Sequence, residues 1–116
     1  MRACKVWTLA LVALAACGGA QLNQTRATDV QAAVLAAEQV GAPDQPKAAL
    51  HLQLAKEEVE QAKRLAADGD ETNSNLLLDR ARVDAELALQ LARTEREQQT
   101  AQQAWEKIRD LKEPPR

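Results

Sequence analysis

The chain has 116 residues and a formal net charge of −2, and 28% of its residues are charged while only 2% are aromatic. The 15 basic and 17 acidic side chains are interspersed, which argues against a nucleic-acid-binding protein, because such proteins need a clustered basic face. Ala and Leu supply most of the apolar content and there is no Phe or Tyr, so the length allows one small domain whose residues favour helix.

The N-terminal segment has the pattern of a secretory signal. Arg2 and Lys5 form a positive start, and Val6 to Ala13 form an apolar core. This core is too short to span a bilayer, which needs about 20 apolar residues. Small residues then precede a cysteine, and Leu14 to Cys17 resemble the lipobox of bacterial lipoproteins. A plain cleaved signal is the alternative, and it leaves Cys17 without a role.

The lipobox resemblance implies cleavage before Cys17 and acylation of that residue. Cys17 would carry a thioether-linked diacylglycerol and a further acyl chain, such as palmitate, on its amine, and two or more chains anchor a protein firmly. Gly18 in place of Asp implies, by the same resemblance, sorting to the outer membrane. Cleavage removes residues 1–16 and leaves 100 residues with a formal charge of −4 and no free thiol. Residues 17–27 are then predicted to form a lipidated tether.

The first helix is predicted from Thr28 to Val40. Thr28 and Gln31 fit a capping box, and Gly41 followed by Pro43 predicts the end of the helix. The apolar residues at helical spacing are Val30, Ala33, Val34, Ala37 and Val40.

The second helix is predicted to begin at Asp44 as the N-cap, with Pro46 in the first turn, and to end at Asp68-Gly69-Asp70. Glu60 and Arg64 are four residues apart and are predicted to form an ion pair on the outer face. A heptad repeat rich in alanine forms the apolar face of this helix: Ala48, Leu52, Ala55, Val59, Ala62 and Ala66.

The third helix is predicted to begin between Asp70 and Asn75. The short break at Gly69 predicts an antiparallel hairpin with the second helix, supported by i, i+4 pairs of Arg80 with Asp84 and of Arg82 with Glu86. The small-residue face of this helix is Leu78, Ala81, Ala85, Ala88 and Ala92.

The fold class follows from these predicted elements. We predict an all-α domain over residues 28–112, in which an antiparallel helical hairpin packs with one shorter N-terminal helix as a small, coiled-coil-like bundle. No segment has the pattern of a strand, and the Pro114-Pro115 pair predicts a disordered tail over residues 113–116.

The alanine repeat stops after Ala92. Arg93 to Gln103 contain one apolar side chain, Ala101, and apolar spacing resumes at Ala104. Residues 72–112 as one helix would span roughly 60 Å, whereas a second helix of some 22 residues would cover about 33 Å. Three large apolar residues in the uncovered part could fold against the first helix, or they could bind a partner. They are Trp105, Ile108 and Leu111.

Two segments resemble a bacterial lipoprotein family of unknown function. They are the alanine spacing from Ala48 to Ala67, followed by the Gly69 break, and the run from Ala81 to Ala88. Members of that family are short Ala-rich helical domains behind a lipobox, and some precede a peptidoglycan-binding domain like that of outer-membrane protein A. The resemblance covers about residues 29–94. It implies no catalytic residues, and this chain has no segment resembling the wall-binding domain.

The polar residues give no pattern typical of catalysis or metal binding. His51 has Lys47 and Ala55 as its i−4 and i+4 neighbours, so no metal site is predicted. Glu57, Glu58 and Glu60 lie among basic residues and are predicted to form a solvated, ion-paired face. Ser74 lacks the histidine and glycines of a nucleophile elbow. We therefore expect neither enzymatic activity nor a cofactor.

The sequence thus favours a lipid-anchored protein on the periplasmic face of the outer membrane, acting as a structural or protein-interaction module. Its partners would be the lipid bilayer, through Cys17, and either an envelope protein or a second copy of the chain. One alternative is a self-associating coiled-coil spacer near peptidoglycan, although the chain ends in Arg116 and not in the lysine of wall-linked lipoproteins. A chaperone-like carrier is a further alternative, and it would need a larger apolar surface.

Overall fold

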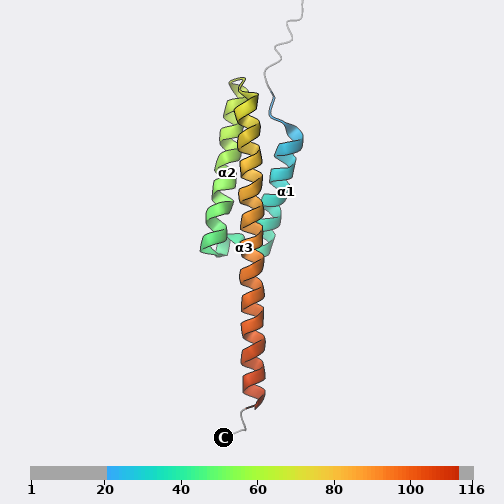
Figure 1. Cartoon of the computed structure of the whole chain (residues 1–116), viewed down its shortest axis with the longest axis vertical. Helices are drawn as coiled ribbons and strands as arrows, with labels where there is room; N and C mark the ends of the chain where they lie inside the picture. Colours follow the sequence, from blue (N-terminus) through green and yellow to red (C-terminus); the bar gives the residue numbers. More distant parts are fainter. Residues whose placement is uncertain (1–20, 113–116) are drawn as a thin grey trace, which may run out of the picture.

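The computed structural model describes residues 21–112 (Figure 1), so the predicted leader, Cys17 and the predicted tail over 113–116 lie outside the described residues. Its elements are α1 (Gln24–Val40), a short 3₁₀ helix η1 (Ala42–Asp44), α2 (Pro46–Ala67) and α3 (Glu71–Lys112). No strand occurs within residues 21–112, and the predicted all-α class is confirmed.

The three helices form a hairpin with a third helix along its other side. α2 and α3 are antiparallel and meet at the turn around Gly69, and α1 runs parallel to α3 and shares a buried cluster with both α2 and α3 (Figure 1). α3 contacts both other helices extensively, whereas α1 and α2 contact each other little. The predicted hairpin with a shorter N-terminal helix is therefore confirmed, with α3 as the central element.

Helix α1 begins four residues before the predicted start. Asn23 is its N-cap, and the Asn23 side chain accepts a hydrogen bond from the backbone N–H of Arg26 at 3.1 Å. Thr28 is not a cap, because its hydroxyl donates to the carbonyl of Gln24 inside the helix at 2.8 Å. The last four residues of the predicted tether are thus helical. The predicted end is confirmed, since Gly41 is the C-cap with φ +94°, a left-handed conformation that suits glycine.

The start of α2 also differs from the prediction. Asp44 lies inside η1, and Gln45 occupies the N-cap without a side-chain hydrogen bond. Pro46 takes the first helical position, where its missing N–H costs nothing. At the other end, Gly69 adopts φ +89° and the Asp70 carboxylate accepts from the backbone N–H of Asn73 at 3.1 Å, which starts α3.

Alanine dominates the buried interface. The predicted apolar positions of α2 and α3 are buried, except that Val59 is half-buried and its neighbour Glu58 takes the buried position. Ser74, one turn before Leu78, extends the buried face of α3, and its hydroxyl donates to the carbonyl of Ala62 at 2.9 Å. Burial of apolar surface stabilises a fold by about 25 cal/mol per Å². Because each small side chain buries little apolar area, the stability of the bundle depends on a long interface. Buried alanines at this interface are Ala48, Ala55, Ala62, Ala66, Ala81, Ala85, Ala88 and Ala92.

Helix α1 covers the second side of α3. Val30 packs with Leu78 and Ala81, and Ala37 packs with Ala88 and Ala92. Ion pairs connect α1 to each of its neighbours: Arg26 with Asp79 of α3, and Glu38 with Lys56 of α2 at 2.5 Å.

Candidate partner-binding surface

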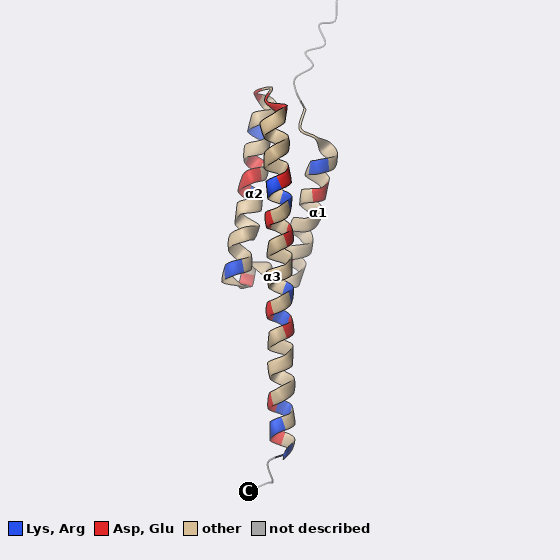
Figure 2. Cartoon of the chain, viewed as in Figure 1, with Lys and Arg blue, Asp and Glu red and all other residues tan. Residues whose placement is uncertain are grey.

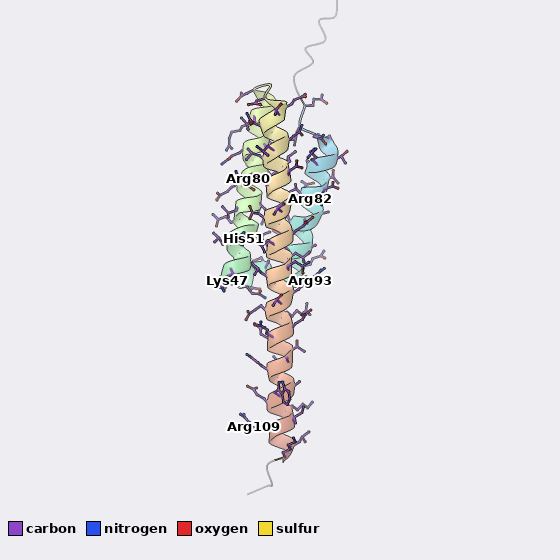
Figure 3. The ribbon with its side chains drawn as sticks, in the orientation of Figure 1. Lys47, His51, Arg80, Arg82, Arg93 and Arg109 are labelled. Atoms are coloured by element: carbon purple, nitrogen blue, oxygen red, sulfur yellow. The ribbon has the colours of Figure 1, made fainter. Side chains whose placement is uncertain are left out.

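Helix α3 runs far past both of its partners. α1 and α2 leave α3 near Ala92, and its last twenty residues continue as a single exposed helix (Figure 1). We call residues 93–112 the overhang and residues 21–92 the body. At 1.5 Å per residue the overhang is about 30 Å long. Figure 3 shows Arg93 at the level where the body ends and Arg109 close to the far end of the helix.

The overhang exposes three large apolar side chains of α3. Trp105 is 70% exposed, Ile108 43% and Leu111 81%. The interpretation that these residues fold against the first helix is therefore wrong, because α1 ends well before their level. The prediction that packing stops near Ala92 is confirmed, since every residue from Arg93 to Lys112 is exposed.

The apolar residues of the overhang lie on the α1 side of α3. Val40, at the end of α1, lines a shallow open groove together with Ala101 and Ala104 of the overhang. Ile108 and Leu111 lie about one and two turns further along the same side of the helix. The 3-4-3 spacing of these four residues is that of a heptad repeat. We call Ala101, Ala104, Ile108 and Leu111, with Trp105 at their edge, the apolar stripe.

The alanine face toward α2 has no continuation in the overhang. Ala101 follows Ala92 by nine residues, which is about 180° of rotation around the helix. At the heptad positions that continue the α2-facing repeat, the side chains are Glu95, Gln99 and Gln102. The apolar face of α3 therefore changes sides where the body ends, and the apolar stripe is not a leftover of the interface with α2.

Charge divides the overhang into three segments (Figure 2). Residues 93–97 contain two arginines and two glutamates. Residues 106–112 contain three basic and two acidic side chains. Between these segments, residues 98–105 carry no charge. The middle of the overhang thus combines an uncharged surface with small apolar residues, which lowers the desolvation cost of a contact there.

A second polar cluster lies inside the body, between α2 and α3. His51 Nδ1 is 2.7 Å from the Asp84 carboxylate, and Arg80 contacts the carboxylate of Glu58 at 3.0 Å. Figure 3 shows His51 and Arg80 along this pair of helices. The predicted Arg80–Asp84 pair within α3 is wrong, because both residues pair across the interface, whereas the predicted Arg82–Glu86 pair is present at 2.8 Å.

Glu58 is the unusual member of this cluster. The predicted solvated face is wrong for this residue, which is 7% exposed. Burial raises the pKa of Glu58, Arg80 opposes that rise, and the nearby Asp84 carboxylate adds to it through charge and a shared hydrogen bond. Its neighbour Glu60 pairs with Lys63 at 2.6 Å and not with the predicted Arg64. A buried polar cluster of this kind fixes the register of two helices whose alanine faces fit in several registers.

Within residues 21–112 neither a metal centre nor a membrane span is found. No three His, Cys, Asp or Glu residues in this part of the chain lie close enough to hold a metal ion. None of the described helices is both long and apolar enough to cross a bilayer. The packing of the body leaves the overhang unexplained, and it also leaves several large apolar side chains of the body exposed, among them Leu50, Leu76 and Val83.

These features define a class of protein: a small all-α chain in which a three-helix body carries a projecting helix. The chain belongs to a family known as a domain of unknown function, DUF4398, whose model matches residues 20–104. The match covers the body and the alanines of the apolar stripe, and it ends one residue before Trp105. No curated protein and no solved structure gives a significant match. The expected membership of an uncharacterised helical family is confirmed.

Proposed function

We propose that this chain is a lipid-anchored envelope protein, attached through Cys17 to the periplasmic face of the outer membrane, that presents its overhang to a protein partner. The observation that carries the proposal is the position of the two ends of the fold. α1 begins beside the α2–α3 turn, and the overhang extends from the opposite end of the body (Figure 1). The lipobox pattern before Cys17 supports the anchor.

The dimensions suit a protein that reaches away from a surface. Five residues lie between Cys17 and Asn23, and the six steps along an extended chain span at most about 20 Å. Leu111 lies forty residues beyond Glu71 on one helix, which is about 60 Å. With the anchor at the α1 end, the apolar stripe would be held at a fixed distance from the bilayer by a rigid helix.

The exposed surface favours binding over carriage of apolar cargo. A carrier needs an enclosed or broad apolar surface, whereas the groove at Val40 is shallow and open. An exposed Trp next to two branched aliphatic residues is typical of the centre of a protein–protein contact. The overhang therefore supports an interaction role better than a carrier role.

The anchor is tested by metabolic labelling with a fatty acid in a bacterial host. Cys17→Ser should abolish the label, because the thioether needs a sulfur atom, while the matched variant Cys4→Ser should keep it. Undiminished label in Cys17→Ser would refute the anchor.

Partner binding is tested separately with a photoreactive amino acid at position 105 in intact cells. The proposal expects specific adducts from position 105 and none from position 103, about 200° around the helix. Absence of adducts at both positions, with the protein present in the membrane fraction, would refute the presenting role.

A further inference from the structure

We propose that the partner of the apolar stripe is a second copy of this chain, bound through the overhang in antiparallel orientation. The inference rests on the proposed interaction role and names the occupant of the surface. Three observations carry it: the position of α1, the distribution of side-chain size along the stripe, and the distribution of charge.

The position of α1 excludes a parallel pair. α1 packs along the same side of α3 that carries the apolar stripe further on, as the groove shared by Val40 and Ala101 shows. Two α3 helices aligned in parallel and in register through their stripes would place both α1 helices in the space between them. An antiparallel pair that overlaps only through the overhangs avoids this clash, because each α3 then ends near the end of the other copy's α1.

Side-chain size also favours the antiparallel pair. The stripe has a small half, Ala101 and Ala104, followed by a large half, Ile108 and Leu111. Antiparallel heptads place Ala101 of one copy opposite Leu111 of the other, and Ala104 opposite Ile108. Every layer then combines one small and one large side chain, which is the alternation that lets facing helices interdigitate. A parallel pair would place Ala against Ala and leave those layers poorly filled.

The charges are compatible with the same alignment. Residues 98–105, which are uncharged, lie opposite the residues that begin at Lys107 of the other copy. Glu106 lies level with Glu106 of the other copy, but it is about 180° around the helix from the apolar stripe, so the two carboxylates do not meet. Lys112 reaches the level of Thr100, which together with Glu97 lines the groove next to Val40. Of the charged residues that line this groove, Glu97 is nearest that level, three residues away, whereas Arg96 and Arg93 are four and seven residues away.

The two overhangs would meet through only about four facing pairs of stripe residues, so the association should be weak and depend on concentration. The overhang is already helical as a continuation of α3, so binding does not have to nucleate a helix. Attachment to a common membrane surface would raise the effective concentration of the two copies.

Sedimentation of residues 18–116, which contain every described helix, tests the proposal. We expect a monomer at micromolar concentration and a dimer as the concentration approaches millimolar. Ile108→Glu should shift the dimer midpoint at least tenfold upward, and Gln103→Glu, which adds the same charge on the opposite face, should leave it within twofold. Thermal unfolding followed by circular dichroism should be the same for both variants in dilute solution, which separates loss of contact from loss of fold.

Orientation is tested by mixing Ala101→Cys and Leu111→Cys proteins under oxidising conditions. The antiparallel pair predicts mostly mixed disulfides, whereas a parallel pair predicts each variant linked to itself. A chain that stays monomeric at millimolar concentration, or that prefers self-linked products, overturns the proposal. Adducts from position 105 in cells with masses other than twice that of the chain would also overturn it, and the presenting role would then survive with a different partner.

Discussion

The two halves of α3 have the same secondary structure and opposite surroundings. Residues 71–92 bury six side chains against α1 and α2, and residues 93–112 bury none. The buried half uses mainly alanine, while the exposed half carries Trp105, Ile108 and Leu111. Helix formation in the overhang therefore depends on intrinsic propensity and on continuation of an existing helix. The half within the body also exposes large apolar residues (Leu76, Val83 and Leu87), but only the overhang presents them with no other helix alongside.

The largest difference in stability effect between the two halves should appear when an alanine is replaced by a larger residue. Ala85→Leu inserts three extra carbon atoms into the fully buried interface and should lower the free energy of unfolding by about 1–3 kcal/mol. Ala101→Leu makes the same change on the exposed half of the same helix and should alter it by less than about 0.5 kcal/mol in dilute solution. Chemical denaturation followed by circular dichroism measures both. Equal losses would show that packing extends beyond Ala92.

Removal of a side-chain hydroxyl should give a smaller difference in stability between the two halves of α3. Ser74→Ala removes the buried hydrogen bond to the carbonyl of Ala62 and should cost about 1 kcal/mol. Thr100→Ala removes the hydroxyl that donates to the carbonyl of Arg96 on the exposed helix, and its effect should be close to zero. Denaturation curves of the two variants decide this, and a neutral Ser74→Ala would contradict the buried hydrogen bond.

The pH dependence of stability should depend on the body and not on the overhang. The pKa of Glu58 is higher in the folded chain than its ordinary value of 4.5, so the folded state holds this proton more tightly. Its contribution to stability is therefore present at low pH and is lost as the pH rises from about 4.5 through the raised folded pKa. Glu58→Gln should flatten this part of the profile, because glutamine has no proton to release.

The matched control for that profile is Glu97→Gln, since Glu97 lies in the exposed overhang. Its unfolding midpoint should follow that of the wild type at every pH. A Glu58→Gln profile that also follows the wild type would show that Glu58 ionises as it does in water.

The smallest expected effect on stability belongs to Trp105, which should be free of the body. In a dilute sample its emission should be red-shifted and easily quenched by acrylamide, and Trp105→Ala should leave the unfolding midpoint unchanged. Residues 18–116 contain no other tryptophan, so the signal reports this position alone. Blue-shifted, quench-resistant emission in a monomer would place Trp105 in the body and would refute the free overhang.

The sequence predicted the helices and their buried faces well, because alanine repeats, Gly41, Gly69 and Pro46 act through local backbone geometry. It predicted the N-caps of α1 and α2 less well, because neighbouring residues can serve as the cap of the same helix. Asn23 took the cap expected at Thr28, and Gln45 took that expected at Asp44. Caps differ in free energy by about 1 kcal/mol, so neighbouring candidates compete closely.

Polar pairing across the interface could not be predicted from spacing alone. Arg80 and Asp84 satisfy the i, i+4 rule within α3, yet each pairs with a residue of α2. That choice depends on the register of α2 against α3, which alanine repeats leave open. Glu58 carried a usable signal, since it lies three residues after Ala55 and four before Ala62 and so occupies a heptad position in its own right.

The unbroken course of α3 through the end of the body has a consequence for amide hydrogen exchange. A helix that is exposed on all sides opens by fraying from its free end, residue by residue, at little cost in free energy. Fraying from Lys112 can proceed to the level of Ala92 and no further, since the next turns are held by α1 and α2. Protection along one continuous helix should thus rise from almost none to the value of global unfolding within a few residues, at a position where the secondary structure itself does not change.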